Sequence, residues 1–388
     1  MKKECLKLSD ERLIDKYRGC LIGGAVGDAL GYPVEFKSEN QIKHKYGEEG
    51  ITEYDPVDGI AHISDDTQMT LYTANGILLG ITRGMTRGIG GKPENYIALC
   101  YKDWYRTQTE EYPLDLPLNF AWISNIPELF SRRAPGQTCL SALSDFTAKG
   151  IRGSIDNPIN KSKGCGGIMR VAPIGIYYDN KRGSIEYADM VAAESAAITH
   201  GHDLGNISAA ALVHIIYRVA HDDSISLLEA TKDMIVYMKK LFRNSKHIKD
   251  FVKLMKKAIK LSSLNIPDAE AIGMLGEGWV AEETLAIALY CSLKHENDFK
   301  KAVVAAVNHG GDSDSTGAVT GNILGARLGL SAIPKQYIDN LELRDLIIEL
   351  ADDLYHDCQI DEYKSSEDGI WEEKYIYRTY KFDRKATR

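Results

Sequence analysis

Glycine recurs at every fourth position in two distant segments of this chain, and this spacing constrains the fold more than any other feature. Residues four apart in a helix lie on one face. Each glycine inside a helix costs about 1 kcal/mol relative to alanine, so close approach of another backbone must compensate. The pattern predicts two helices, 12–31 and 316–329, that meet near the core at short distance; the alternative is that each packs tightly elsewhere. The two glycine stripes are Gly19, Gly23, Gly27, Gly31 and Gly317, Gly321, Gly325, Gly329.

Helical patterns dominate the remainder of the chain. Its 388 residues, 44% of them hydrophobic, supply enough apolar material for a large core. An alternating pattern occurs only near the end, where KYIYRTYKF (374–382) is expected to be a short extended segment. No linker divides the chain, which predicts one all-α domain over 1–358 and a C-terminal extension, 359–388, packed on it. Helices are expected at 10–31, 65–79, 91–108, 138–149, 185–199, 205–221, 225–243, 247–262, 281–294, 298–307, 316–329 and 343–357.

Charge and composition exclude several classes of protein. A net charge of −8 without a dense basic patch is unfavourable for sequence-specific binding of nucleic acid. Glycine stripes also pair helices in membranes, but Arg18, Asp28 and Arg327 within them argue against lipid. No signal peptide or membrane span is expected. Seven scattered cysteines without a CxxC motif fit reduced thiols. These features predict a cytoplasmic protein.

Two acidic clusters stand where helices are predicted to begin: Ser64-Asp65-Asp66-Thr67 and Asp312-Ser313-Asp314-Ser315-Thr316. Asp, Ser and Thr are preferred N-caps, so capping explains either cluster alone. Only one side chain caps, however, and the adjacent carboxylate needs another partner. Several acids buried together require cations. Hard divalent ions with oxygen ligands meet this need, and two Mg²⁺ or Mn²⁺ would nearly balance the four aspartates and Glu35.

Two other metal sites fit the sequence less well. Residues 312–317 match the first six positions of a calcium EF-hand loop, but position twelve is Ile323 where a bidentate Glu is required. For zinc, the best histidine pair is His200-x-His202, and no cysteine is suitably spaced. The sequence therefore favours the carboxylate site over both.

Six segments together resemble the ADP-ribosylglycohydrolase family, which includes the dinitrogenase reductase-activating glycohydrolase. They span most of the chain in the family's order: GCLIGGAVGDALGYPVEF (19–36), ISDDTQMTL (63–71), KGCGGIMRVAPIG (163–175), ITHGH (198–202), GEGWVAEETLAIALY (276–290) and NHGGDSDSTGAVTGNILGARLG (308–329). The resemblance implies an all-α orthogonal multi-helix bundle with a binuclear Mg²⁺ or Mn²⁺ centre in a cleft. It also implies hydrolysis of the glycosidic bond between ADP-ribose and an acceptor.

The same resemblance implies roles for individual residues. Metal ligands would be Ser64, Asp65, Asp66, Asp312, Asp314 and Ser315. Catalysis would involve Glu35, which resembles the family's flap acid, together with Asp65, Asp66 and Asp314. Substrate binding would fall to Ser162, Gly164, Cys165, Gly166, Gly167 and His200, because a glycine loop lets backbone N–H groups approach phosphate oxygens.

The chain departs from the family pattern at two loop positions. Cys165 replaces the asparagine that family loops often carry, and no motif supports a nucleophilic thiol. Lys163 stands where some members place an aromatic residue against adenine, so recognition of adenine is not implied. Trp279 fits either the pocket or a buried core.

The expected activity is metal-assisted hydrolysis that removes ADP-ribose, with an arginine-linked mono-ADP-ribosylated protein favoured as substrate. Alternatives are O-acetyl-ADP-ribose or serine-linked ADP-ribose as substrate. A two-metal phosphoester hydrolase is a further alternative, because paired metal ions also suit in-line displacement at phosphorus. A non-enzymatic ADP-ribose-binding or crystallin-like structural protein is the alternative of another class. The partner is then an ADP-ribosylated protein or a small ADP-ribose compound.

Overall fold

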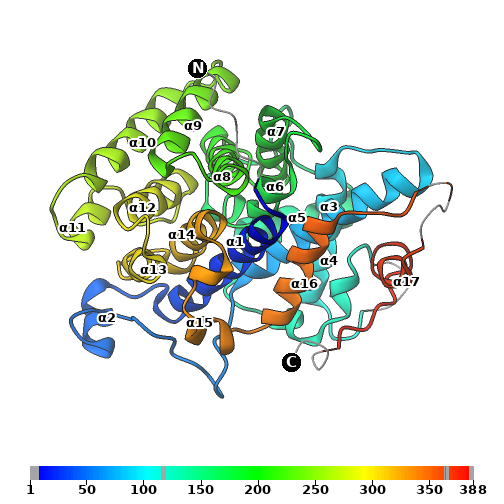
Figure 1. Cartoon of the computed structure of the whole chain (residues 1–388), viewed down its shortest axis with the longest axis horizontal. Helices are drawn as coiled ribbons and strands as arrows, with labels where there is room; N and C mark the ends of the chain where they lie inside the picture. The colour runs from blue at the N-terminus through cyan, green and yellow to red at the C-terminus, as the bar shows by residue number, and fades with distance from the viewer. Residues whose placement is uncertain (1–7, 115–118, 362, 364–366, 384–388) are drawn as a thin grey trace.

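A computed structural model describes residues 8–114, 119–361, 363 and 367–383, and over these ranges the chain is helical without a β-strand (Figure 1). The predicted all-α class is therefore confirmed. No described helix combines the length and apolar character needed to cross a membrane. The helices are α1 Asp10–Gly31, α2 Glu39–Tyr46, α3 Asp65–Arg87, α4 Pro93–Thr109, α5 Gln137–Lys149, α6 Ala172–Tyr177, α7 Ile185–Ala197, α8 Asp203–His221, α9 Leu227–Leu241, α10 Ile248–Ser262, α11 Asp268–Gly273, α12 Ala281–Lys294, α13 Phe299–Val307, α14 Ser313–Leu328, α15 Lys335–Asp339, α16 Arg344–His356 and α17 Gly369–Trp371.

The two glycine stripes face each other in the middle of the molecule, where α1 and α14 lie side by side (Figure 1). A Cβ atom added to Gly19 would lie 2.5 Å from the carbonyl oxygen of Gly325. Gly23 faces Gly321 and Gly27 faces Gly317 in the same way, so the helices run antiparallel. The predicted close contact is confirmed, and it leaves room for backbone but not for a side chain.

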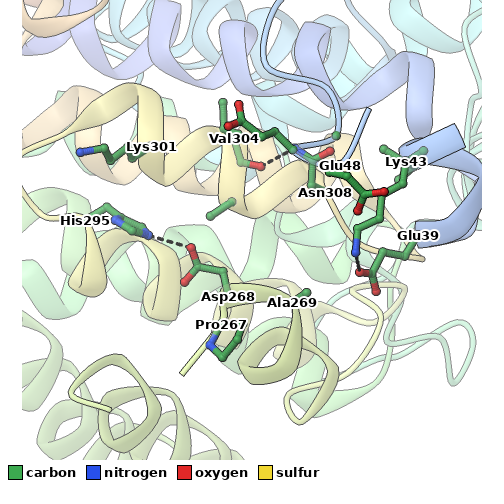
Figure 2. A pocket seen from close by; sticks show the side chains of 14 residues that line it. Glu39, Lys43, Glu48, Pro267, Asp268, Ala269, His295, Lys301, Val304 and Asn308 are labelled. Carbon is green, nitrogen blue, oxygen red and sulfur yellow. Dashed lines mark hydrogen bonds and ion pairs between the residues drawn. The ribbon is translucent and has the colours of Figure 1, made fainter. Parts of the chain in front are cut away.

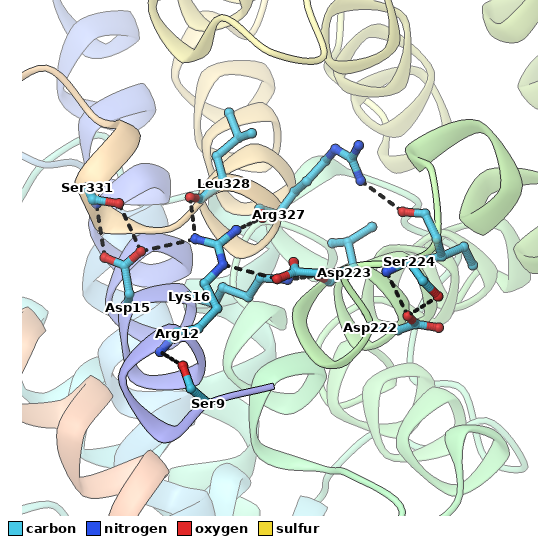
Figure 3. Close-up of polar contacts among 12 residues, drawn as sticks. Ser9, Arg12, Asp15, Lys16, Asp222, Asp223, Ser224, Arg327, Leu328 and Ser331 are labelled. Atoms are coloured by element: carbon cyan, nitrogen blue, oxygen red, sulfur yellow. Dashed lines mark hydrogen bonds and ion pairs between the residues drawn. The ribbon is translucent and has the colours of Figure 1, made fainter. Parts of the chain in front are cut away.

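Polar contacts fix the first turns of α1 against the end of α14 (Figure 3). The Arg12 guanidinium donates to the carbonyl oxygens of Leu328 at 2.8 Å and Arg327 at 3.0 Å, which are left unpaired at the end of a helix. Lys16 is fully buried; its Nζ donates to the Val219 carbonyl at 2.7 Å and pairs with Asp223. These contacts fix α1 lengthwise against α14 and against the end of α8.

The helices that carry the acidic clusters begin at those clusters. α3 starts at Asp65 as expected, but its last residue is Arg87 rather than residue 79. Its C-cap is Gly88, whose φ of 63° is left-handed. α14 starts at Ser313, three residues before the expected position, because the Asp312 side chain caps it. The short helices α2, α6, α11 and α15 were not expected, because one or two turns show too little hydrophobic periodicity to predict a helix.

The segment expected to be extended at 374–382 is helical in its first part. Residues Glu372–Tyr377 form a π-helix that ends at Arg378, whose φ is 61°. Contacts to α16 and α3 override the alternating pattern: Lys374 pairs with Glu349 and Asp353 at 2.7 Å, and the indole N–H of Trp371 donates to Thr82 at 2.9 Å.

Candidate functional site

A cavity of about 710 Å³ brings the two acidic clusters together, although 247 residues separate Asp65 from Asp312. Ten of the residues with a predicted metal, catalytic or substrate role line it: Glu35, Asp65, Asp66, Gly164, Cys165, Gly166, His200, Asp312, Asp314 and Ser315. Ser64, Ser162 and Gly167 lie beside these residues without lining the cavity. The packing of α1 against α14 places the start of α14 beside α3.

In the first cluster, capping uses the serine and leaves the two carboxylates available. Ser64 is fully buried, and its Oγ accepts a hydrogen bond from the Asp66 backbone at 3.2 Å. Asp65 Oδ2 accepts from the Gly136 backbone at 3.3 Å. Asp66 Oδ2 is buried and has no hydrogen-bond partner among the described residues.

Asp28 orients this cluster from the glycine-striped helix α1. Its carboxylate accepts hydrogen bonds from the backbone N–H of Ser64 at 3.0 Å and of Thr67 at 3.1 Å, and from the Thr67 hydroxyl. Burial and the nearby Asp314 raise the pKa of Asp28 to about 7. Asp28 was not among the predicted site residues; its signal was a lone carboxylate in the otherwise apolar segment 19–31 of α1.

In the second cluster, both aspartates line the cavity, and Asp312 also caps α14. Asp312 accepts from the Ser315 backbone at 3.2 Å, and Asp314 Oδ1 accepts from the same N–H at 2.9 Å. The Ser315 hydroxyl oxygen is buried without a partner among the described residues. In this cluster, therefore, a carboxylate rather than a serine caps the helix, and the serine hydroxyl is left without a partner.

The site concentrates negative charge away from water. Burial, and secondly the Asp314 carboxylate, raise the pKa values of Asp65, Asp66 and Asp312 well above their usual range. Burial and Asp314 also raise the pKa of Glu35, whose Oε2 has no partner among the described residues. Unpartnered oxygen atoms from both clusters and Glu35 are the donor set that hard divalent cations prefer. The residues present therefore fit Mg²⁺ or Mn²⁺.

An exposed aromatic pair stands at the cavity beside Glu35. The rings of Phe36 and Trp279 stack with centroids 5.3 Å apart and planes 20° apart, and both residues line the cavity. Trp279 is 36% exposed, which excludes the buried-core alternative. Phe36 has a φ of 63°, a left-handed conformation that non-glycine residues rarely adopt. This conformation places Glu35 and Phe36 together at the cavity.

The glycine loop lines the cavity next to Trp279 and is fixed to the segment before α12. Cys165 N donates to the Trp279 carbonyl at 3.2 Å, and Ala281 N donates to the Lys163 carbonyl at 2.9 Å. A Cβ atom on Gly166 would lie 3.0 Å from the His200 ring, so glycine permits this close approach. Burial raises the pKa of the Cys165 thiol well above its usual value, which disfavours a thiolate nucleophile.

His200 lies under this loop as a neutral imidazole. Burial, and secondly Arg170, lower its pKa to about 3. His200 Nδ1 and the Thr199 hydroxyl lie 2.8 Å apart, and Arg170 Nη2 donates to the same hydroxyl at 2.7 Å. Arg170, which was not predicted as a site residue, is fully buried and lies over the Tyr101 ring at 4.2 Å.

Arg132 is the one lysine or arginine among the described residues that line the cavity. It is exposed and forms no hydrogen bond or ion pair with a described residue. The adjacent Arg133, in contrast, binds both carboxylate oxygens of Glu342, at 2.8 and 3.0 Å. Arg132 is therefore free to contact an anionic ligand.

A second cavity of about 400 Å³ lies between α2 and α11–α13 (Figure 2). Four of its charged side chains form two pairs: His295 contacts Asp268 at 3.0 Å, and Lys43 contacts Glu39 at 2.5 Å. Asn308 donates to the Val304 carbonyl at 2.8 Å. None of the carboxylates from the two acidic clusters reaches this cavity, so the candidate site is the larger one.

Comparison with known proteins agrees with the resemblance. The family model described as ADP-ribosylglycohydrolase matches residues 9–363. The chain is 24% identical to the ADP-ribosylhydrolase ARH3 of Mus musculus over 357 residues, which cover 86% of this chain and 89% of that protein. It is 24% identical to the ADP-ribosyl-[dinitrogen reductase] glycohydrolase of Rhodospirillum rubrum, with coverage of 85% and 91%. It is also 24% identical to the ADP-ribosylarginine hydrolase Tri1 of Pseudomonas putida, with coverage of 92% and 82%.

A solved structure shares the fold. The chain superposes on a protein from an ADP-ribosylglycohydrolase-related protein complex with a TM-score of 0.59 and 24% identity, over 89% of this chain and 99% of that one. This similarity establishes the helical architecture that the resemblance implied.

Proposed function

Because the chain belongs to the ADP-ribosylglycohydrolase family, we propose that it is a metal-dependent hydrolase that releases ADP-ribose from arginine-linked, mono-ADP-ribosylated protein. The observation that carries the proposal is the meeting of two acidic clusters, Glu35 and a glycine loop around one cavity. A simple capping role for the clusters leaves unexplained why the remaining carboxylates face one another in a buried site.

Two divalent cations, Mg²⁺ or Mn²⁺, would be held by Ser64, Asp65 and Asp66 from one cluster and by Asp312, Asp314 and Ser315 from the other. Bound there, such ions supply Lewis-acid activation of water and orient the ribose hydroxyls. The unpartnered oxygens of Asp66 and Ser315 support this assignment. Ser64 caps α3 as well, so its contribution requires that its hydroxyl serve both functions.

The chain's own residues would stabilise charge and move a proton. Cleavage at the anomeric carbon develops oxocarbenium character, and Asp65, Asp66 and Asp314 provide compensating negative charge. Glu35 would exchange a proton with the leaving acceptor atom, since its Oε2 lies at the cavity without another partner. The stacked rings of Phe36 and Trp279 would limit the entry of water beside that acid.

The diphosphate of the substrate would lie along the glycine loop. Backbone N–H groups of Gly164–Gly167 can approach phosphate oxygens because no side chain intervenes. His200 Nε2 lies close to Gly164, and a neutral imidazole protonated on Nε2 would donate to the same phosphates. Ser162 would position the loop, because its Oγ accepts from the Gly164 backbone at 3.4 Å.

The choice of arginine as the acceptor rests on the relative named an ADP-ribosylarginine hydrolase, and it is tested with a panel of substrates. Purified protein with Mg²⁺ is given arginine-linked, serine-linked and O-acetyl ADP-ribose, and free ADP-ribose is measured. Preferential release from the arginine-linked substrate supports the proposal. Preference for another substrate would replace the acceptor and keep the reaction, whereas tight binding of ADP-ribose without any release would favour a non-enzymatic protein.

We propose further that residues 1–358 form one domain with the C-terminal extension packed on it, and that the protein acts in the cytoplasm. The fully buried contact surface of α1 and α14, which joins the two ends of that range, supports a single domain. Expression of 1–358 alone tests the division: it should keep every cavity-lining residue but lose stability, because Trp371, Lys374 and Tyr375 of the extension are buried.

A further inference from the structure

Two histidines and an aspartate meet outside the candidate active site. His202 precedes α8, Asp203 is the first residue of α8, and His247 precedes α10. Their potential ligand atoms all lie within 4.8 Å of one another. Asp203 Oδ1 is 3.1 Å from His202 Nδ1 and 3.9 Å from His247 Nε2. The two imidazole rings have centroids 4.8 Å apart. None of the three residues lines the cavity that holds the acidic clusters.

A neighbouring serine holds the aspartate in place. The Ser245 hydroxyl donates to Asp203 Oδ2, and the backbone N–H of His247 donates to Ser245 Oγ at 3.1 Å. One carboxylate oxygen is thus fixed by Ser245 while the other faces the imidazoles. Outer contacts of this kind orient the ligands of metal sites.

The contact between His202 and Asp203 pairs two hydrogen-bond acceptors. Leu204 N donates to His202 Nδ1 at 3.1 Å, so Nδ1 carries its lone pair rather than a proton. The Asp203 oxygen at 3.1 Å from the same nitrogen is also an acceptor. A cation near Nδ1 and Oδ1 would relieve this contact.

We propose that His202, Asp203 and His247 bind a transition-metal ion of the zinc class. Two imidazole nitrogens and one carboxylate suit Zn²⁺, Co²⁺, Ni²⁺ or Cu²⁺, whereas Mg²⁺ prefers oxygen ligands. The side chains are 23%, 34% and 28% exposed, so water can complete the coordination. Binding at Nδ1 replaces the hydrogen bond from Leu204, and the positive N-termini of α8 and α10 weaken the attraction of a cation. Moderate affinity is therefore expected.

The ion would join two helices to the glycine-loop segment. His202 N donates to the Ser162 carbonyl at 3.0 Å, and Ser162 in turn contacts Gly164. Residues 202 and 247 are too far apart in sequence for their spacing to indicate a site. His200 and His202, the pair considered for zinc from the sequence, do not point toward a common metal position. His200 faces the cavity, and His202 faces His247.

Binding of Cu²⁺ in the presence of excess Mg²⁺ tests this proposal, with electron paramagnetic resonance as the readout. Nitrogen hyperfine structure from two imidazoles is expected, because the carboxylate clusters contain no such pair. His247→Ala and His202→Asn should each lower the affinity for Zn²⁺ by at least about tenfold; asparagine retains the capping of α8. His295→Ala is the matched control, since His295 contacts Asp268 in a pair with a single histidine.

The outcomes separate clearly. Loss of affinity and of nitrogen coupling in the two site variants, with the control unchanged, supports the site. Equal affinity in all the variants, or a wild-type spectrum without coupling to two nitrogens, overturns it and indicates adventitious binding only. Melting temperatures measured with EDTA distinguish lost binding from lost folding, because all four proteins should then melt alike. The test does not depend on ADP-ribosylhydrolase activity.

Discussion

At the scale of single residues, the candidate site is defined by buried carboxylates that no described side chain neutralises. Asp314 is central because it influences Asp28, Glu35, Asp65, Asp66 and Asp312 through its charge. Asp314→Asn is predicted to lower the affinity for Mn²⁺ by more than the roughly 10–100-fold typical of losing an outer contact. Calorimetric titration measures this, and Glu39→Gln, in the second cavity, is the control. Unchanged affinity in Asp314→Asn would contradict the site assignment.

Arg132 offers a prediction about the substrate. A charged hydrogen bond to phosphate contributes about 1.5–3 kcal/mol, so Arg132→Gln should raise KM at least about tenfold and leave kcat nearly unchanged. Arg132→Lys keeps the charge and should recover part of the loss. Steady-state kinetics measures both variants. A fall in kcat at constant KM would instead place Arg132 in the chemical step.

His214 supplies a prediction about pH and stability away from the site. It is fully buried and contacts Asp189 at 2.9 Å and Asp233 at 3.5 Å, beside Arg218 and Tyr237. Burial alone would lower the pKa of His214, but hydrogen bonds to Asp189 and Asp233 outweigh it and raise the pKa. Burial also raises the pKa of Asp189 to about 6, so the pair holds protons that the unfolded chain releases.

Because the pKa of His214 is higher in the folded than in the unfolded protein, protonated His214 stabilises the fold below the unfolded pKa of 6.5. This stabilisation is lost as pH rises through the folded-state pKa. The free energy of unfolding of the wild type should therefore fall, relative to His214→Gln, as pH rises above about 6.5. Urea denaturation across this range measures the difference. If the wild type instead becomes more stable relative to His214→Gln as pH rises, then His214 is neutral in the folded protein.

At the scale of helices, the contact between α1 and α14 places the acidic clusters. Gly19→Ala should destabilise the protein by about 2 kcal/mol or more, because the new Cβ meets backbone atoms at 2.5–2.6 Å that cannot rotate away. Gly84→Ala in α3 is the control: its Cβ would lie 3.9 Å from Gly90 Cα, and alanine should stabilise the helix by up to about 1 kcal/mol. Equal changes in melting temperature would contradict the close-packing account.

Sequence predicted the helices well where a cap or stripe marked them, and less well where tertiary contacts decide. The starts of α1 and α3 follow from Ser9 and Ser64 as caps, whereas α14 begins three residues before its expected start because Asp312 caps it. The end of α3 could not be placed, because the close approach of α4 lets the helix continue through Gly76 and Gly80. The π-helix near the end depends on Lys374 reaching two acids of α16, which the local pattern does not encode.

At the scale of the whole molecule, the sequence predicted which residues meet but not what surrounds them. The two acidic clusters could be brought together because two glycine stripes implied one helix contact and the resemblance covered both. Arg132 and Arg170 carry no such signal, since an isolated arginine has no periodic pattern. The meeting of His202 with His247 depends on how α8 and α10 begin side by side, which only the folded chain shows.

The most direct test of the central claim is release of ADP-ribose from an arginine-ADP-ribosylated protein, measured with Mg²⁺, with EDTA, and after Mg²⁺ is restored. Metal-dependent hydrolysis predicts release with Mg²⁺, none with EDTA, and recovery when the ion returns. Release that continues unchanged in EDTA would contradict the metal-dependent mechanism. No release with Mg²⁺ or Mn²⁺ would contradict arginine as the acceptor.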